Sequence, residues 1–499
     1  MCARLRYTKL TDTKTSIDTM KKALTAILLT IAAACATAQT YSFTFKLEGR
    51  TDTVLYIVRH HRDRLVKVDS CRAQRSTYRF EGRRQWERGV YSLAGQDGKK
   101  MIGDFVVDAS RRFTIAADAK MTAASVKVKG CPSNEAMFKY LAVEDAARSE
   151  ADEIAARKKD PATREQAERD DEALTERMLA FETEARHPAK PNIFFTLVNL
   201  CDSPEVPDSV TEKGVYYRRH YWDALFDTKD ASGTRAFDTY RTALLYSPQL
   251  FSKMNYFFYG MLYYADSDTI CAEIDRLAAR IGDDTAMLRY VFDHIEPRYF
   301  RSTKNVGWDA VWCHLASEYY LKGRCPWATE GTIHNMRYNY NRLRQSLIGA
   351  PGQELWMADT NQSSNPADWI SSHRFPTRYV ILWFWDPDCH HCQEQSAELK
   401  VLYDSLQAAG NHRFEVYAIG YESDVEKWKR YVREHDFRWV NVGGTNVNID
   451  YQEAYNVHGA PTMIILNERR DIIMNKVLPA KSIMQFLDNY EKRSKGVKE

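Results

Sequence analysis

Two cysteines, Cys389 and Cys392, are separated by two residues and follow a run of aromatic and branched side chains at 380–385. The run predicts a buried strand, and the helix-forming residues 393–406 predict a helix that starts at the cysteines. The unpaired N–H groups and the dipole of a helix N-terminus stabilise a thiolate by roughly 0.3–1 kcal/mol. This arrangement predicts thiol-disulfide exchange, in which Cys389 attacks and Cys392 resolves the mixed disulfide.

The spacing around this pair argues against two other uses of the cysteines. A c-type haem site requires a histidine directly after the second cysteine, whereas Gln393 follows Cys392. A structural zinc site usually requires a second pair of Cys or His ligands, and no such pair is evident in the sequence. We therefore expect neither a metal nor a cofactor.

Two histidines, His390 and His391, separate the cysteines. A protonated histidine beside a thiolate lowers the pKa of the thiol, so both side chains are candidates for modulating the site. For His391 we expect stabilisation of the Cys389 thiolate, with a solvent-facing side chain as the alternative. For His390 we expect a solvent-facing side chain, with stabilisation of the Cys389 thiolate as the alternative.

The segment from about Leu347 to Tyr490 resembles a thioredoxin-fold domain. The resemblance rests on the strand, on Trp385 four residues before Cys389, on the Cys-x-x-Cys pair, and on the sequence Gly459-Ala460-Pro461-Thr462. In that family the position of Pro461 is a cis-proline, whose loop packs beside the cysteines and offers backbone groups to an extended substrate. The resemblance thus implies a substrate-binding loop at Ala460, Pro461 and Thr462, with Trp385 as a further modulating residue.

The order of expected elements agrees with this resemblance. After the motif we expect a helix near 392–409, a strand at 414–421, a helix at 424–435, strands at 463–466 and 472–477, and a helix at 480–493. This order predicts an α/β domain with a central sheet flanked by helices.

Several positions depart from the thioredoxin pattern. The acid that thioredoxins bury six residues before the first cysteine is Trp383 here, so the usual proton acceptor for the resolving thiol is missing. The glutamate and the proline expected three and five residues after the second cysteine are Gln395 and Ala397. A histidine directly before the second cysteine resembles strongly oxidising exported dithiol enzymes. We therefore expect a disulfide more oxidising than that of cytosolic thioredoxin, at about −270 mV.

The N-terminal residues 1–38 have the pattern of an upstream extension followed by an export signal. Met20-Lys21-Lys22 precede an apolar stretch at 23–34, and Ala36-Thr37-Ala38 offers a cleavage site before Gln39. The alternative is lipidation at Cys35. We expect the protein in the periplasm or cell envelope, either free or as a lipoprotein through Cys35.

The composition of the 499 residues, 44% hydrophobic and 27% charged, predicts a globular chain of about three domains. The formal charge is +3, and residues 1–38 carry six basic and two acidic side chains, which leaves the exported chain near −1. Such a chain lacks the basic surface of a nucleic-acid-binding protein. Six further cysteines could pair in an oxidising compartment, although we expect small buried hydrophobic side chains: Cys71, Cys131, Cys201, Cys271, Cys313 and Cys325.

Three domains follow the signal segment. Residues 39–130 contain short alternating apolar runs, which predict an antiparallel β-sandwich-like domain. Residues 131–345 predict an all-α domain that begins with a helical hairpin, and residues 346–499 form the expected thioredoxin-like domain. The first two domains resemble domains of unknown function that precede thioredoxin-like domains in exported bacterial proteins. We expect His60-His61 to lie in a solvated loop.

The chain thus resembles an exported bacterial envelope thiol-disulfide oxidoreductase, which would reduce or isomerise disulfides of envelope proteins through its Cys-His-His-Cys dithiol. Expected partners are exported proteins with disulfides or thiols, a membrane or envelope electron donor and a second copy of the chain, bound through the upstream domains; nucleic acid is not expected. The alternative is a redox-inactive envelope binding or scaffold protein that retains the thioredoxin fold. Loss of the buried acid favours the scaffold, whereas Cys389, Cys392, Trp385 and Pro461 favour the enzyme.

Overall fold

The computed structural model describes residues 41–99, 101–187, 192–230, 232–301, 305–421 and 424–494. The chain forms two compact units, Met1–Phe257 and Phe258–Glu499, each described by itself below. The expected export signal at 1–38 lies outside the described residues. Within those residues no helix is both long enough and apolar enough to cross a membrane. The domain boundaries expected from the sequence stay predictions.

The N-terminal strands form one sheet. They are β1 (Tyr41–Glu48), β2 (Val54–His61), β3 (Arg64–Gln74), β4 (Thr77–Gly82), β5 (Gly89–Ala94), β6 (Met101–Val107), β7 (Arg112–Asp118) and β8 (Lys127–Lys129). Over the described residues they pair in the order β6-β5-β2-β3-β4-β1-β7-β8. Neighbouring strands run antiparallel, apart from the parallel pair of β1 and β7. The expected β-rich domain is confirmed.

The core of this domain lies between the two halves of the sheet. Alternation along β1 buries Phe43 and Phe45 on one face. Phe105 of β6, at the other end of the strand order, packs against both rings, with centroid distances of 6.4 and 5.1 Å. The halves therefore face each other as in a sandwich.

The expectation for His60 is wrong. The His60-His61 pair ends strand β2 and does not lie in a loop. Because successive side chains of a strand point to opposite faces, His60 faces inward, where it is 8% exposed and its Nε2 lies 2.8 Å from Ser92 Oγ. A buried hydrogen bond thus replaces the expected contact with solvent.

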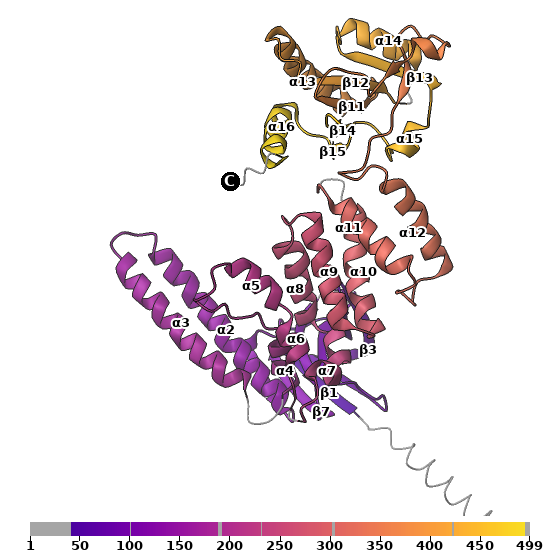
Figure 1. Cartoon of the computed structure of the whole chain (residues 1–499). Helices are drawn as coiled ribbons and strands as arrows, with labels where there is room; N and C mark the ends of the chain where they lie inside the picture. The colour runs from indigo at the N-terminus through magenta and orange to yellow at the C-terminus, as the bar shows by residue number, and fades with distance from the viewer. Residues whose placement is uncertain are drawn as a thin grey trace, which may run out of the picture. The chain divides into compact units, whose positions relative to one another are not determined.

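The first unit continues with helices (Figure 1). They are η1 (Ala123–Ser125), α2 (Pro132–Arg157), α3 (Arg164–Arg186), α4 (Ile193–Leu200), α5 (Lys213–His220), α6 (Asp223–Asp227), α7 (Ala236–Leu245) and α8 (Pro248–Tyr256). Helices α2 and α3 form the expected hairpin around Ile154, Ala167 and Leu174. An ion pair between Arg157 and Asp170 joins the two helices at 2.6 Å. The predicted helical middle region is therefore confirmed.

The second unit begins with more helices. They are the π-helical turn η2 (Phe257–Met261), which starts at the last residue of the first unit, α9 (Ser267–Ile281), α10 (Thr285–Arg301), α11 (Trp308–Leu315), the π-helical turn η3 (Ala316–Tyr320) and α12 (Glu330–Leu343). Aromatic side chains fill the contacts between them: Phe292 of α10 meets Tyr319 of η3 edge to face, at 4.7 Å between ring centroids. Aromatic residues at helical spacing thus serve as core here.

The C-terminal elements form an α/β domain, coloured from brown to yellow in Figure 1. They are β9 (Trp356–Asp359), η4 (Pro366–Asp368), β10 (Ile370–Ser371), β11 (Tyr379–Trp385), α13 (His390–Ala408), β12 (Phe414–Gly420), α14 (Val425–Glu434), β13 (Val440–Val447), α15 (Tyr451–Ala454), β14 (Thr462–Leu466), β15 (Ile472–Met474) and α16 (Ala480–Ser494). In the described part of the chain the strand order is β10-β9-β13-β12-β11-β14-β15. The expected thioredoxin-like order is confirmed, with strands β9, β10 and β13 and the short helices η4 and α15 as additions.

Both faces of strand β11 are buried, because the strand lies between β12 and β14 inside the sheet and a core covers each side. Ile381, Trp383 and Trp385 face a core that also contains side chains of α13, α14 and α16. The alternate residues Leu382 and Phe384 face a second core, together with side chains of β9 and α15. A strand covered on both faces is a continuous apolar run, which explains the sequence that leads to the cysteines.

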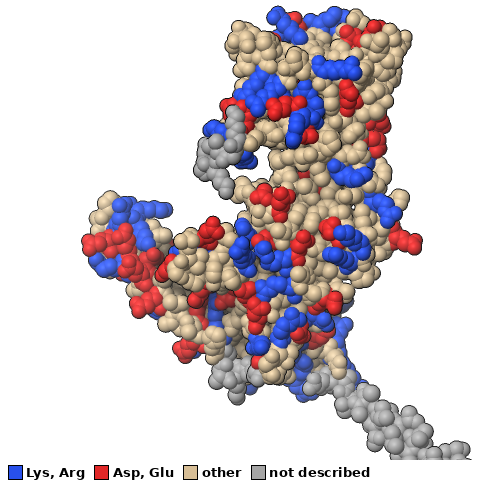
Figure 2. Space-filling model, viewed as in Figure 1, with Lys and Arg blue, Asp and Glu red and all other residues tan. Residues whose placement is uncertain are grey.

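Charged side chains of both signs occur over the visible surface. On the face shown in Figure 2, Lys and Arg side chains lie interspersed with Asp and Glu side chains. This mixture agrees with the small formal charge of the sequence.

Candidate dithiol site

The cysteine pair lies where β11 ends and α13 begins. Helix α13 starts at His390, with Cys389 as its N-cap residue, as predicted. The N–H of Cys392 donates a hydrogen bond to Cys389 Sγ over 3.2 Å. A donor at a helix N-terminus favours the charged form of the sulfur that accepts from it. The structure thus places Cys389 Sγ at the N-terminus of α13, where it accepts a backbone hydrogen bond, as the sequence predicted.

The two sulfurs differ in their access to solvent. Cys389 is partly exposed, whereas Cys392 is completely buried in the core beneath it. Burial, together with a hydrogen bond to Cys389 and a smaller effect of the Asp386 carboxylate, raises the pKa of the Cys392 thiol to about 12. An accessible first thiol and a buried second thiol fit the expected roles of attacking and resolving sulfur.

The expected substrate-binding loop lies beside the first cysteine. The peptide bond between Ala460 and Pro461 is cis, as the resemblance implied. Cys389 Sγ lies 3.6 Å from the carbonyl oxygen of Ala460. Thr462 Oγ1 donates to the carbonyl of Gly459 over 2.8 Å and closes the loop on itself. The loop therefore lies in contact with Cys389 Sγ, and its role in binding substrate stays a prediction.

Both histidines of the motif extend into solvent. The side chains of His390 and His391 are 78% and 82% exposed, and each lies beside the Glu394 carboxylate, at 3.3 and 3.5 Å. These positions fit the solvent-facing role expected for His390 and the solvent-facing alternative for His391. The roles of both residues in modulating the site stay predictions. Glu394 was not among the residues expected at the site. Its spacing of three and four residues on a helix was a readable signal.

Trp385 packs in the core that also contains Cys392. It is fully buried, and its ring lies 5.5 Å from the rings of Tyr431 and of Phe437. It therefore fixes the end of β11 against α14 and the segment that follows α14, on the helical face of the sheet.

Trp383 fills the interior at the position where the resemblance places an acid. The indole is completely buried, and its Nε1–H donates to Ser396 Oγ over 2.9 Å. Ser396 lies one turn after Cys392 on α13. The pair satisfies a buried donor but provides no carboxylate beneath the resolving thiol.

An exposed ion pair lies beside the motif. Asp388, directly before Cys389, pairs with Lys427 of α14. Both side chains are about half exposed or more, so the pair contributes little to stability. Neither residue was predicted from the sequence, since the partner comes from a helix 39 residues away.

The remaining cysteines have the properties of core side chains. None of the cysteines in the described residues forms a disulfide, and Cys131, Cys313 and Cys325 are buried. Burial raises the pKa of Cys71, Cys201 and Cys271 to about 12 as well. Thiols of this kind are unreactive at neutral pH. The same residues contain no group of three or more His, Cys, Asp or Glu side chains that could hold a metal ion.

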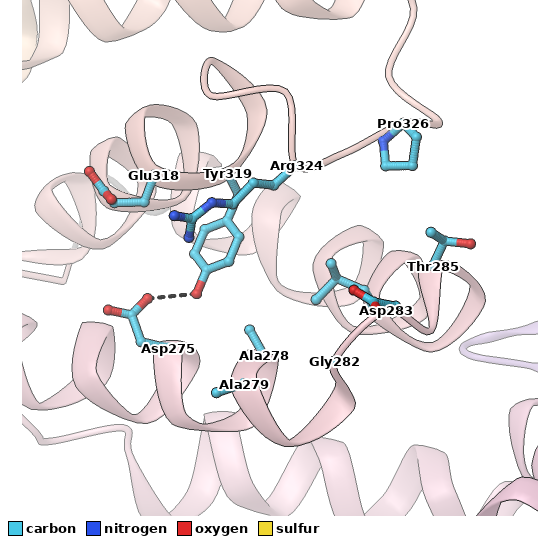
Figure 3. Close-up of a pocket in the computed structure, with 11 residues that line it drawn as sticks. Asp275, Ala278, Ala279, Gly282, Asp283, Thr285, Glu318, Tyr319, Arg324 and Pro326 are labelled. Carbon is cyan, nitrogen blue, oxygen red and sulfur yellow. Dashed lines mark hydrogen bonds between the residues drawn. The ribbon is translucent and has the colours of Figure 1, made fainter.

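The helices of the second unit enclose a separate hollow of about 660 Å³ (Figure 3). Asp275 of α9 accepts hydrogen bonds from Tyr319 over 2.7 Å and faces His314 Nε2 at the same distance. Glu318 pairs with Lys322 at 2.6 Å. Asp275 and Glu318 are therefore engaged by neighbouring side chains, and none of the residues that line this hollow belongs to the dithiol site.

Residues 377–472 match the family model described as Thioredoxin-like. Among solved structures, the chain is similar to a domain of a possible thiol-disulfide isomerase from Cytophaga hutchinsonii, with 28% identity, a TM-score of 0.26, and coverage of 30% of this chain and 97% of that one. It is also similar to a thioredoxin-like protein from Bacteroides caccae, with 15% identity, a TM-score of 0.42, and coverage of 58% and 98%.

A third similar structure is a thiol-disulfide oxidoreductase from Bacteroides fragilis, with 22% identity, a TM-score of 0.24, and coverage of 28% of this chain and 98% of that one. No curated protein matches the chain. The family match spans β11, α13 and the Ala460-Pro461 loop, the same elements that build the dithiol site. The C-terminal part of this chain is a thioredoxin-like domain.

Proposed function

We propose that the protein is an exported thiol-disulfide oxidoreductase that reduces or isomerises disulfides of envelope proteins. One observation carries the proposal: a partly exposed Cys389 Sγ at a helix N-terminus accepts a hydrogen bond from the N–H of a buried Cys392. A reactive thiolate and a shielded resolving thiol are the two groups that such an enzyme requires.

The first step joins the enzyme to its substrate. The Cys389 thiolate attacks one sulfur of a substrate disulfide, whose S–S bond breaks as a new S–S bond forms to Cys389. The other substrate sulfur leaves as a thiolate and takes a proton from solvent. Attack requires the substrate chain to pass the Ala460 carbonyl, 3.6 Å from Cys389 Sγ.

The second step releases the substrate. Cys392 loses its proton and attacks Cys389 Sγ, so that the Cys389–Cys392 disulfide forms and the second substrate sulfur leaves as a thiolate. Two electrons have then moved from the dithiol to the substrate. In isomerisation, a substrate thiol attacks the mixed disulfide instead, and Cys389 returns to its reduced form with no net electron transfer.

Location and partners follow from this chemistry and from the sequence. The export pattern at 1–38 supports a mature chain in the periplasm or envelope that begins near Gln39, or at Cys35 if that residue is lipidated. Net reduction consumes the dithiol at every turnover, so it needs an envelope electron donor. N-terminal sequencing of the protein from cell envelopes should find one of these two starts. An intact Met1 on protein from the cytosol contradicts export.

Covalent trapping tests the proposed activity. A Cys392→Ala variant keeps the attacking thiol but cannot resolve, so it should accumulate mixed disulfides with exported proteins. These adducts should disappear on reduction and should be missing from a Cys389→Ala, Cys392→Ala control. If both variants retain the same proteins without a covalent bond, and neither reacts with small disulfides, the chain is a scaffold and the proposal fails.

A further inference from the structure

A cavity of about 640 Å³ lies directly beside the cis-proline loop in the second unit. Its walls come from two places in the sequence. Helices α10 and α12 supply Tyr299, Phe300 and Asn339, and the thioredoxin-like domain supplies Pro461, Thr462 and Val477. The volume is within the range of roughly 300–1,000 Å³ that is typical of ligand clefts. The helical segment therefore forms part of a site that the thioredoxin-like fold alone does not build.

Hydrogen bonds hold these two walls together. Asn475, just after β15, donates through Nδ2 to Asp309 Oδ2 over 2.6 Å and to the carbonyl of Ser346 over 2.9 Å. Lys476 Nζ lies 3.4 Å from the same Asp309 carboxylate, which is almost buried. The start of α11 and the segment after α12 are thus tied to the edge of the sheet, which fixes the shape of the cavity.

The cavity combines apolar surface with groups that bind a peptide backbone. Phe300 and Val477 are 44% and 36% exposed, which is high for large apolar side chains. Asn339 and Asn456 add side-chain amides to the lining, and the buried Oδ1 of Asn475 has no hydrogen-bond partner among the described residues. An unpartnered buried acceptor costs free energy, and a donor from a bound chain would satisfy it.

The cavity borders the loop whose backbone contacts the reactive sulfur. Ala460, whose carbonyl oxygen lies 3.6 Å from Cys389 Sγ, is flanked in sequence by Gly459 and Pro461. Both flanking residues line the cavity. A polypeptide bonded to Cys389 that follows this loop is therefore directed along a path that leads to the cavity.

We propose that this cavity binds the polypeptide segment next to the target cysteine of the substrate, with preference for an apolar or aromatic side chain in that segment. The proposal rests on the function proposed above and adds a substrate class: extended protein segments rather than small disulfides. A small disulfide occupies only Cys389 and the Ala460 backbone. It gains nothing from the helical wall.

The preference for apolar side chains can be tested with full-length Cys392→Ala protein and synthetic peptides. Each peptide has a single cysteine, and this cysteine carries a nitrothiobenzoate leaving group. One peptide has Phe on both sides of its cysteine and a matched peptide has Ser there; cysteamine with the same leaving group serves as the small probe. Released nitrothiobenzoate gives the rate constant for attack by Cys389, after subtraction of the rate of the double cysteine variant. The Phe peptide should react at least about tenfold faster than the Ser peptide, which corresponds to about 1.4 kcal/mol.

Two substitutions on opposite walls should abolish this preference. Asn339→Trp fills the cavity from α12, and Val477→Glu adds a carboxylate on the other side without filling it. His334→Trp is the matched control, because His334 is exposed on α12 and does not line the cavity. It should keep the preference, and all three variants should react with the cysteamine probe at the unsubstituted rate within about twofold.

Each outcome separates the two proposals. Equal rates for the two peptides before substitution, or a preference that survives both Asn339→Trp and Val477→Glu, overturns the cavity proposal and leaves the exchange chemistry standing. Failure of every probe, including cysteamine, to release nitrothiobenzoate overturns the proposed function itself.

Discussion

We predict that Cys392 attacks the mixed disulfide at Cys389 slowly. Burial is the largest cause of the raised pKa of this thiol, and burial does not depend on the Cys389 thiol, which a mixed disulfide consumes. Each unit by which burial raises the pKa lowers the thiolate fraction at neutral pH about tenfold. A more basic thiolate is also a better nucleophile, with a Brønsted coefficient of about 0.4–0.5, which recovers about 2.5- to 3-fold of each tenfold loss. We therefore expect resolution about three- to fourfold slower for each unit by which the pKa of Cys392 is raised in the mixed disulfide.

A chromophoric mixed disulfide gives the measurement. Nitrothiobenzoate is attached to Cys389 at acid pH, where Cys392 is protonated, and the release of the chromophore is followed after a jump to higher pH. The rate constant should rise about tenfold for each pH unit between pH 7 and 9, because the thiolate fraction rises in that proportion below the pKa.

A Cys392→Ala variant, which cannot resolve, gives the background rate at each pH. A release rate that is already independent of pH across this range means that Cys392 ionises near neutrality or that a base assists it. Either result refutes the reasoning from burial.

Three further predictions concern the surroundings of the dithiol. Ser396→Ala should lower the free energy of unfolding in urea by about 1–3 kcal/mol, because the buried Trp383 N–H loses its acceptor; an unchanged midpoint contradicts this hydrogen bond. Glu394→Gln removes a negative charge beside the histidines and should make the disulfide about 4–20 mV more oxidising in glutathione buffers, whereas a more reducing disulfide contradicts the sign. The isolated segment 347–493 should fold and exchange with small disulfides, because both cores of the C-terminal sheet come from within it; a disordered circular dichroism spectrum contradicts this expectation.

The local part of the site could be predicted because its signals are local. The apolar run of β11 and the helix formers after Cys392 fix a strand, a turn and a helix within about thirty residues. Strand β13 was missed because Gly443 and Gly444 interrupt a short, partly polar segment that lacks a strand pattern. Its pairing with β12 and β9 depends on the tertiary fold.

Side-chain surroundings were harder to predict than elements. His60 was expected in solvent because two adjacent histidines are polar, but alternation at the end of β2 turns one of them inward. Similarly, the position of His391 at a helix N-terminus allows contact with the thiolate or with solvent, and Glu394 one turn later lies beside it. The partner of His60 comes from another strand, which the sequence does not show, whereas the contact of His391 is local and its role stays a prediction.

The cavity beside the cis-proline had no local signal. Phe300 and Val477 are 177 positions apart in the sequence, and only the packing of α10 and α12 beside β15 brings them into one lining. Neither residue is part of a motif. Single exposed apolar side chains are common on protein surfaces, so neither one indicates a binding site by itself.

Slow resolution by Cys392 and binding of the substrate segment in the cavity would both prolong the life of the mixed disulfide. A mixed disulfide that Cys392 resolves slowly stays attached while other thiols of the same substrate compete for Cys389 Sγ. A substrate segment held in the cavity dissociates more slowly than a small thiol, which prolongs that competition further. A buried acid that speeds proton loss from Cys392 would shorten it, and Trp383 fills that position. Of the two reactions proposed for the dithiol, the geometry therefore favours isomerisation over net reduction.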